Sequence, residues 1–196
     1  MATASSTQQQ AERLPPGAQR YGPVAIAFHW LMVVLVLVVG VLGLLHDSWP
    51  DATQDFWINF HAILGLTVWL AVVVRLGWRL THRPPDLPPD VGELTRRLSY
   101  PVHLLLYALM FLVPVVGTLT FLYQGRHFHF GLFQINPHMH HNDAIAGPTE
   151  TVHGYMAYVL FGLIGLHVLA ALWHHFIRRD GILLRIWPVR RGGRGA

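Results

Sequence analysis

Histidine is the residue type in this chain that is best suited to chemistry. The sequence has 14 histidines among 196 residues and no cysteine. The absence of cysteine excludes disulfides, thiolate metal sites, iron–sulfur clusters and covalent haem attachment through a CxxCH motif. Burying an imidazole within an apolar segment costs free energy unless its nitrogens have hydrogen-bond or metal partners. The first hypothesis for each such histidine is therefore a functional role.

Three histidines near the C-terminus have a spacing that places them on one face of a helix. His153 and His167 are fourteen residues apart, which at 100° per residue is about 40° short of four full turns and about 21 Å along the axis. His174 follows seven residues later and is roughly aligned with both. One helix face therefore offers imidazoles at three levels.

The elements that must position these side chains are membrane-spanning helices. The chain is 53% hydrophobic and 12% charged, whereas soluble domains are about 25% charged. An apolar stretch at 24–45 would be about 33 Å long as a helix, enough to cross a bilayer. We expect an all-α membrane protein with a four-transmembrane-helix bundle in one domain, 21–188. Its helices are expected at about 24–45, 61–80, 102–123 and 153–177, between a disordered or surface tail at 1–20 and a basic tail at 189–196.

Arginine placement predicts the orientation. The chain has no lysine, and every arginine except Arg126 lies in the tails, at the end of the second stretch or in the linker before the third. The positive-inside rule then places both termini of this multi-pass membrane protein in the cytoplasm. The sequence pI near 10 is explained by this bias, so we expect membrane lipid and no nucleic acid as a partner.

Depth matching between the expected helices pairs four of the histidines. His61 and His153 each open a helix at the outer surface, whereas His29 and His167 lie at similar depths near the inner one. Each pair could complete a six-coordinate haem iron, and two stacked haems would form an electron path across the membrane. The alternative for each single histidine is a hydrogen-bonded packing role.

Three further residues lie near the cytoplasmic side. His103 opens the third stretch and His174 nearly closes the fourth, so we expect them to share a third, shallower level. Arg75 interrupts the second stretch near the level of the inner pair. It could bind a haem propionate or extend to the inner headgroups.

An outer loop at 127–141 contains five histidines. They are candidates for an accessory site for Zn²⁺, Cu²⁺ or Ni²⁺, because imidazole suits those ions; the other interpretation is a solvated, histidine-rich loop. A histidine-rich membrane protein that binds or transports metal without haem is thus an alternative function. The cluster consists of His127, His129, His138, His140 and His141.

Several short motifs, taken in order, are similar to one known family. They are FHW at His29, NFH at His61, PVHLLLY at His103, LVPVVG at Pro114 and GLHVLAALWHH from Gly165. Over about residues 20–188 the chain resembles the bacterial cytochrome b561 family of four-helix, di-haem inner-membrane proteins. The resemblance implies two non-covalent b haems, with the four paired histidines as axial ligands.

The resemblance also implies an oxidoreductase linked to quinone. A branch of the family takes electrons from superoxide at the outer face and reduces ubiquinone at the inner face, and its quinone pocket matches His103 and His174. The donor in the periplasm is open: the outer loops here carry five acidic residues against Arg126, a field that opposes the approach of an anion such as superoxide. A cytochrome b subunit serving a dehydrogenase or a periplasmic carrier is the remaining alternative.

Overall fold

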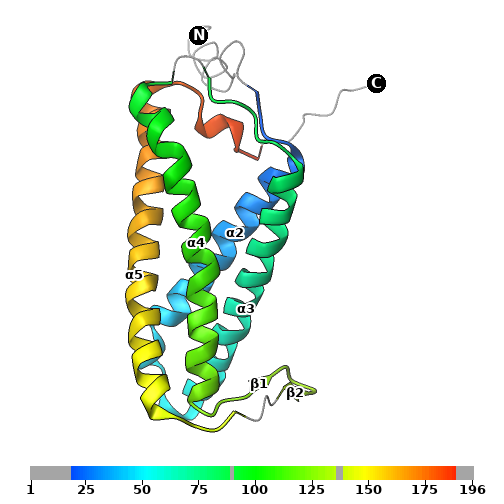
Figure 1. The fold of residues 1–196 in the computed structure, drawn as a ribbon, viewed down its shortest axis with the longest axis vertical. Helices are drawn as coiled ribbons and strands as arrows, with labels where there is room; N and C mark the ends of the chain where they lie inside the picture. The colour runs from blue at the N-terminus through cyan, green and yellow to red at the C-terminus, as the bar shows by residue number, and fades with distance from the viewer. Residues whose placement is uncertain (1–18, 89–90, 136–138, 189–196) are drawn as a thin grey trace, which may run out of the picture.

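The computed structural model describes residues 19–88, 91–135 and 139–188, and four long helices account for most of them. The helices are α2 (Pro23–Leu44), α3 (Asp51–Thr81), α4 (Glu93–Tyr123) and α5 (Asp143–Trp173). All four are long and apolar enough to cross a membrane. The expected all-α bundle of four spanning helices is confirmed, and Figure 1 shows the helices running side by side along the long axis.

Polar residues extend three of these helices beyond the apolar stretches. Helices α3, α4 and α5 each start on an acidic residue, namely Asp51, Glu93 and Asp143, and negative charge stabilises a helix N-terminus. The Asn142 side chain also caps α5 by accepting a hydrogen bond from the Ala144 N–H at 3.1 Å. Each of these helices therefore begins before its hydrocarbon-crossing part.

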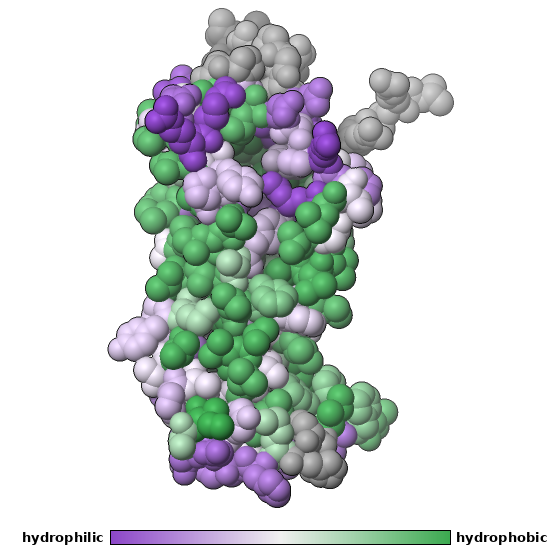
Figure 2. Space-filling model, viewed as in Figure 1, coloured by the Kyte–Doolittle hydropathy of each residue, from purple (hydrophilic) through white to green (hydrophobic). Residues whose placement is uncertain are grey.

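Two small apolar clusters hold the middle of the bundle together. One joins α2 to α3 and the other joins α4 to α5, while the outward faces of the same helices expose leucine and valine. Figure 2 shows the result as an apolar band around the middle of the molecule, with hydrophilic surface at both ends. The clusters consist of Met32, Val36, Val68 and Val72, and of Leu106, Leu109, Val113 and Leu160.

The two ends of the bundle are built differently. At one end, here called the hairpin end, the short η1 helix (His46–Ser48) joins α2 to α3, and a two-stranded antiparallel sheet of β1 (Phe128–His129) and β2 (Gln134–Ile135) follows α4. The opposite end, here called the basic end, contains residues 19–22, 82–88 and 91–92 together with η2 (His174–Arg178) and η3 (Leu183–Arg185).

A buried arginine fastens the chain segments of the basic end to one another. The Arg185 guanidinium, 2% exposed, donates to the carbonyl oxygens of Gln19, Pro85 and Asp86 at 2.7 to 3.0 Å. The Tyr21 N–H donates in turn to the Arg185 carbonyl at 3.1 Å. The segment before α2, the α3–α4 linker and the segment after α5 thus form one layer over this end.

Candidate functional site

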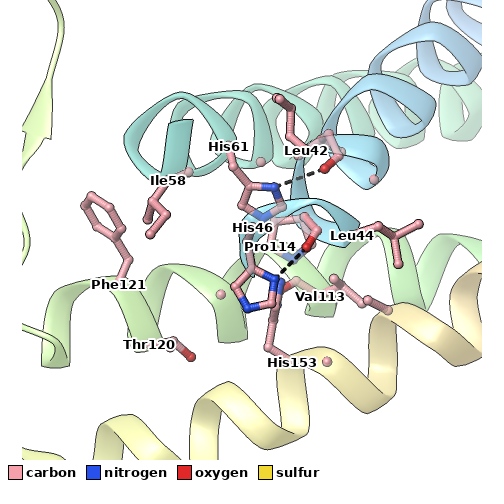
Figure 3. A pocket seen from close by; sticks show the side chains of 18 of the residues that line it. Leu42, Leu44, His46, Ile58, His61, Val113, Pro114, Thr120, Phe121 and His153 are labelled. Atoms are coloured by element: carbon pink, nitrogen blue, oxygen red, sulfur yellow. Dashed lines mark hydrogen bonds between the residues drawn. The ribbon is translucent and has the colours of Figure 1, made fainter. Parts of the chain in front are cut away.

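The structure brings the four paired histidines together in two places inside the bundle. His61 of α3 faces His153 of α5 at the hairpin end, with ring centroids 6.1 Å apart and planes at 89°. His29 of α2 faces His167 of α5 toward the basic end, with centroids 6.5 Å apart and planes at 59°. Figure 3 shows the first pair between its helices.

These separations suit two imidazoles that bind one metal ion from opposite sides. Metal–imidazole bonds of about 2 Å, extended to the ring centres, place the centroids of such a pair about 6 Å apart. Both pairs are close to that value. The hairpin-end pair lies among largely apolar side chains, and the spacing of both pairs fits the axial ligand set of a haem iron.

Backbone carbonyls preset the tautomer of the hairpin-end pair. Nδ1 of His61 donates to the Val39 carbonyl of α2 at 3.0 Å, and Nδ1 of His153 donates to the Val113 carbonyl of α4 at 3.0 Å (Figure 3). Because a carbonyl can only accept, the proton sits on Nδ1 and Nε2 keeps its lone pair. This is the arrangement that orients a metal-binding histidine.

A glycine makes each of those carbonyls reachable. Gly43 lies one turn after Val39 and Gly117 lies one turn after Val113, so each glycine sits beside the carbonyl that its histidine binds. A Cβ at position 43 would come within 2.9 Å of the His61 ring, and one at position 117 within 2.7 Å of the His153 ring. The same arrangement, a glycine one turn after the accepting carbonyl, therefore positions both imidazole rings.

A cavity of about 440 Å³ adjoins the hairpin-end pair. It lies between all four helices and is lined mainly by apolar side chains, with both histidines and both seating glycines in its wall. Pockets for small ligands and cofactors are usually of this size and character. Charged side chains occur in the lining as well, and they are Asp47, Arg126 and Glu150.

The basic-end pair has polar neighbours instead of carbonyl partners. Nη2 of Arg75 lies 3.4 Å from Nδ1 of His29, and the guanidinium stands over the Tyr107 ring at 5.5 Å. His103 lies beside His167, with ring centroids 5.5 Å apart. Arg75 therefore points into the bundle at the level of this pair.

His174 lies in a separate buried cluster and is not level with His103. Its Nδ1 donates to the Asp180 carboxylate, its Nε2 lies 3.1 Å from Thr95 Oγ1, and both His174 and Asp180 are 5% exposed. Thr95 precedes His103 by about two turns of α4, about 12 Å along its axis. The depth that His103 and His174 were expected to share is therefore not found.

The outer-loop histidines do not converge where the structure describes them. His141 forms an ion pair with Asp143 at 2.9 Å, and His129 is held through its backbone by Asn59. In the ranges 19–88, 91–135 and 139–188, no group of three or more histidine or acidic residues could hold a metal ion. His138 lies outside the described residues, so the accessory metal site stays a prediction.

Sequence reasoning missed two features of these sites. It did not identify Gly43 and Gly117, because nothing in the sequence shows that each of these glycines faces a histidine. It also missed Asp180 as the partner of His174. The signal for Asp180 was available, because it is the sole acidic residue in 174–196, a segment rich in arginine.

Comparison with known proteins finds one family over most of the chain. Residues 20–189 match the family described as prokaryotic cytochrome b561. The chain is 30% identical over 175 residues to "Cytochrome b561 homolog 2" of Escherichia coli K12, covering 86% of this chain and 91% of that protein. It is 28% identical over 176 residues to "Probable superoxide oxidase CybB" of Yersinia pestis, covering 89% and 99%, and 25% identical over 174 residues to "Cytochrome b561 homolog 1" of E. coli K12, covering 88% and 99%.

Proposed function

Because this chain belongs to the prokaryotic cytochrome b561 family, we propose that it transfers electrons across the bacterial inner membrane with two b haems and exchanges them with quinone. Haem supplies reversible one-electron chemistry when bound. The proposed axial ligands are His61 with His153 at the hairpin end and His29 with His167 toward the basic end. The single observation that supports this most is the pair of centroid separations, 6.1 and 6.5 Å, found twice along α5.

We place the basic end in the cytoplasm and the hairpin end in the periplasm. The described residues of the basic end in 19–22, 82–88, 91–92 and 174–188 contain five arginines, which are Arg20, Arg83, Arg178, Arg179 and Arg185. The described residues of the hairpin end in 45–50, 124–135 and 139–142 contain Arg126 alone, and that side chain is paired with Asp55 at 2.6 Å. The positive-inside rule supports this orientation.

Quinone is proposed to bind toward the basic end. We keep both histidines that the sequence suggested for quinone binding, although they lie in different surroundings. His103 lies next to the basic-end pair, and His174 lies nearer the layer of chain segments that covers the basic end. The Asp180 carboxylate fixes the Nδ1–H of His174, so a hydrogen bond or a proton would be exchanged at Nε2, in place of its contact with Thr95 Oγ1. Quinone reduction consumes protons, and this end is the one that we place at the cytoplasm.

Arg75 is proposed to bind a haem propionate. Its guanidinium is inside the bundle beside His29 and does not extend along the outer surface. For His29 to bind a metal through Nε2, its Nδ1 must carry the proton, so the guanidinium has to give up the contact with Nδ1. A carboxylate is the group that a released guanidinium binds best.

Superoxide is the second candidate, as the electron donor. The observation in its favour is the similarity to the Yersinia pestis protein named a probable superoxide oxidase. The charges in the hairpin-end cavity oppose this donor, since Asp47 and Glu150 outnumber Arg126 and superoxide is an anion. A reconstituted protein that consumes superoxide only when quinone is present would establish this donor, and consumption equal to that of protein-free vesicles would exclude it.

The haem assignment is tested on detergent-purified protein by a reduced-minus-oxidised spectrum with haem counted per chain. We expect a b-type α-band and two haems. His153→Ala and His167→Ala should each remove one haem and leave the other, while His175→Ala on the same segment, outside both pairs, should keep both. Loss of both haems from either ligand variant, or of neither, contradicts the pairing.

A further inference from the structure

The hairpin of residues 128–135 exposes large apolar side chains beyond the bundle. Leu132 at its tip is 101% exposed, Phe133 62% and Ile135 50%. Burial of such surface is worth about 25 cal/mol per Å², so full exposure to water is unfavourable. Figures 1 and 2 show the hairpin projecting sideways from the lower part of the bundle as an apolar protrusion.

Contacts with α3 and α4 hold the hairpin in this position. The Asn59 side chain donates to the His129 carbonyl at 2.9 Å and accepts from the His129 N–H at 3.0 Å. Arg126, just before the hairpin, pairs with Asp55 of α3 at 2.6 Å. Phe128 is buried against Phe121 of α4, with ring centroids 4.7 Å apart. These contacts fix the base of the hairpin and therefore the position of its exposed tip.

The apolar side of the hairpin faces the bilayer-level part of α3. Phe130 and α3 residues between Ile63 and Leu70 line a shallow groove of about 240 Å³. These α3 residues lie deeper in the span than Asn59, with Leu70 about 16 Å further along the axis. Leu66 and Leu70 are 39% and 57% exposed on the outside of the bundle. The groove is continuous with the apolar band that lipid covers.

Much of the hairpin backbone is hydrogen-bonded within the protein. Open sheet edges exposed to lipid are not found within the hydrocarbon core, so a hairpin of two strands belongs at the interfacial level of a leaflet. Strand β1 pairs with β2 on one side, and the Asn59 carboxamide takes both backbone groups of His129 on its other side. At the tip, the Phe130 N–H donates to the Phe133 carbonyl at 2.8 Å.

We propose that this hairpin is a lipid-inserting element, with Leu132 and Phe133 seated in the outer leaflet and phospholipid acyl chains in the groove between Phe130 and α3. The occupant is lipid because the groove continues the lipid-facing surface of α3 and because its lining is almost wholly apolar. Through Phe128 and Phe121, the seated hairpin braces the wall of the hairpin-end cavity, which Phe121 lines. This inference rests on the membrane location alone and not on the haem or quinone assignments.

The natural absence of cysteine allows a direct test by site-directed spin labelling. Leu132→Cys, Thr67→Cys in the groove and, as an aqueous control, Ser48→Cys in the exposed η1 turn are labelled with a nitroxide and reconstituted in phosphatidylcholine vesicles. Relaxation by oxygen, which enriches in lipid, is compared with relaxation by a water-soluble nickel chelate. We expect the labels at 132 and 67 to respond to oxygen and to lose access to the chelate, and the label at 48 to show the reverse.

Two outcomes overturn the proposal. A label at 132 that is as accessible to the chelate as the one at 48 places the tip in water. Labels at 132 that couple to each other at short distance, at every lipid-to-protein ratio, make the occupant a second copy of the chain. The α-band and haem content of each variant report whether the bundle has folded, so a failure of the lipid proposal is distinguishable from a failure of the haem assignment.

Discussion

Replacement of Gly117 by alanine should release the haem proposed for the hairpin end while leaving the rest of the bundle in place. A Cβ at this position would lie 2.7 Å from His153 Cε1 and 2.8 Å from its Nδ1, whereas ordinary carbon–carbon contacts are about 3.5–4.0 Å. The imidazole must therefore move away from α4 by about 1 Å. The 3.0 Å hydrogen bond from Nδ1 to the Val113 carbonyl would then exceed the limit of about 3.5 Å.

The size of the effect follows from the role of that hydrogen bond. Loss of the partner that orients a metal-binding histidine typically costs about 10–100-fold in metal affinity, and we expect a loss of that order for one of two haems. Gly43→Ala should weaken the same haem from a different helix, because its Cβ would lie 2.9 Å from the His61 ring. Haem titration of the apoprotein with pyridine haemochrome counting measures both effects.

Gly162→Ala is the matched control. It changes a glycine within α5 at which an added Cβ meets no atom within 4 Å, and alanine is favoured over glycine in a helix by about 1 kcal/mol. This variant should keep both haems at unchanged affinity. If Gly117→Ala and Gly43→Ala also bind two haems with the affinity of the unmodified protein, then the glycine-seated histidines do not hold haem and the reasoning fails.

Three further predictions concern charges. Arg75→Leu should lower the midpoint potential of one haem by about 40 mV, since removing a nearby cation destabilises the reduced haem by on the order of 1 kcal/mol. Spectroelectrochemical titration tests this. Equal shifts of both haems would contradict the placement of Arg75 beside one of them. Asp180→Asn should destabilise the basic end by about 1.5–3 kcal/mol, because the His174 Nδ1–H loses a charged acceptor. Thermal unfolding followed at the α-band measures this loss of stability. An unchanged unfolding temperature would count against the buried pair of His174 and Asp180. The backbone carbonyl of Gln124 and the Asp143 carboxylate raise the pKa of His141 above its ordinary value. The ion pair between His141 and Asp143 is therefore present below that raised pKa and is lost as the pH rises through it. NMR titration should show a lower His141 pKa in Asp143→Asn, and an unchanged pKa would count against the ion pair.

The sequence was sufficient to predict the four spanning helices and the meeting of four histidines. Both depend on hydropathy and on a regular helical rise, which relate residue number to depth within an apolar stretch. For the same reason His153 and His167 could be placed on one face of α5 from their spacing alone. The partners across the bundle followed because helices that alternate in direction have predictable relative depths.

The level of His103 could not be predicted in this way. Its depth was counted from the start of the apolar stretch at 102, but α4 begins at Glu93, so His103 lies more than two turns inside the helix. His103 is level with His167 instead, and His174, seven residues further along the chain, lies beside Thr95 near the start of α4. Polar helix extensions are invisible to hydropathy, so depths counted from the apolar stretches made these two histidines seem level.

With the two proposed haems bound, the asymmetry between the two histidine pairs would favour the electron at the basic end. The hairpin-end pair is oriented by neutral carbonyls of Val39 and Val113, and its cavity contains more acidic than basic side chains. The basic-end pair has Arg75 within 3.4 Å of one ring, and Arg79 joins Arg75 over the same tyrosine ring. A reduced haem carries one positive charge fewer than an oxidised one, so nearby cations favour reduction and nearby anions oppose it. The fixed charges of this chain thus favour the electron on the side where quinone is proposed to bind.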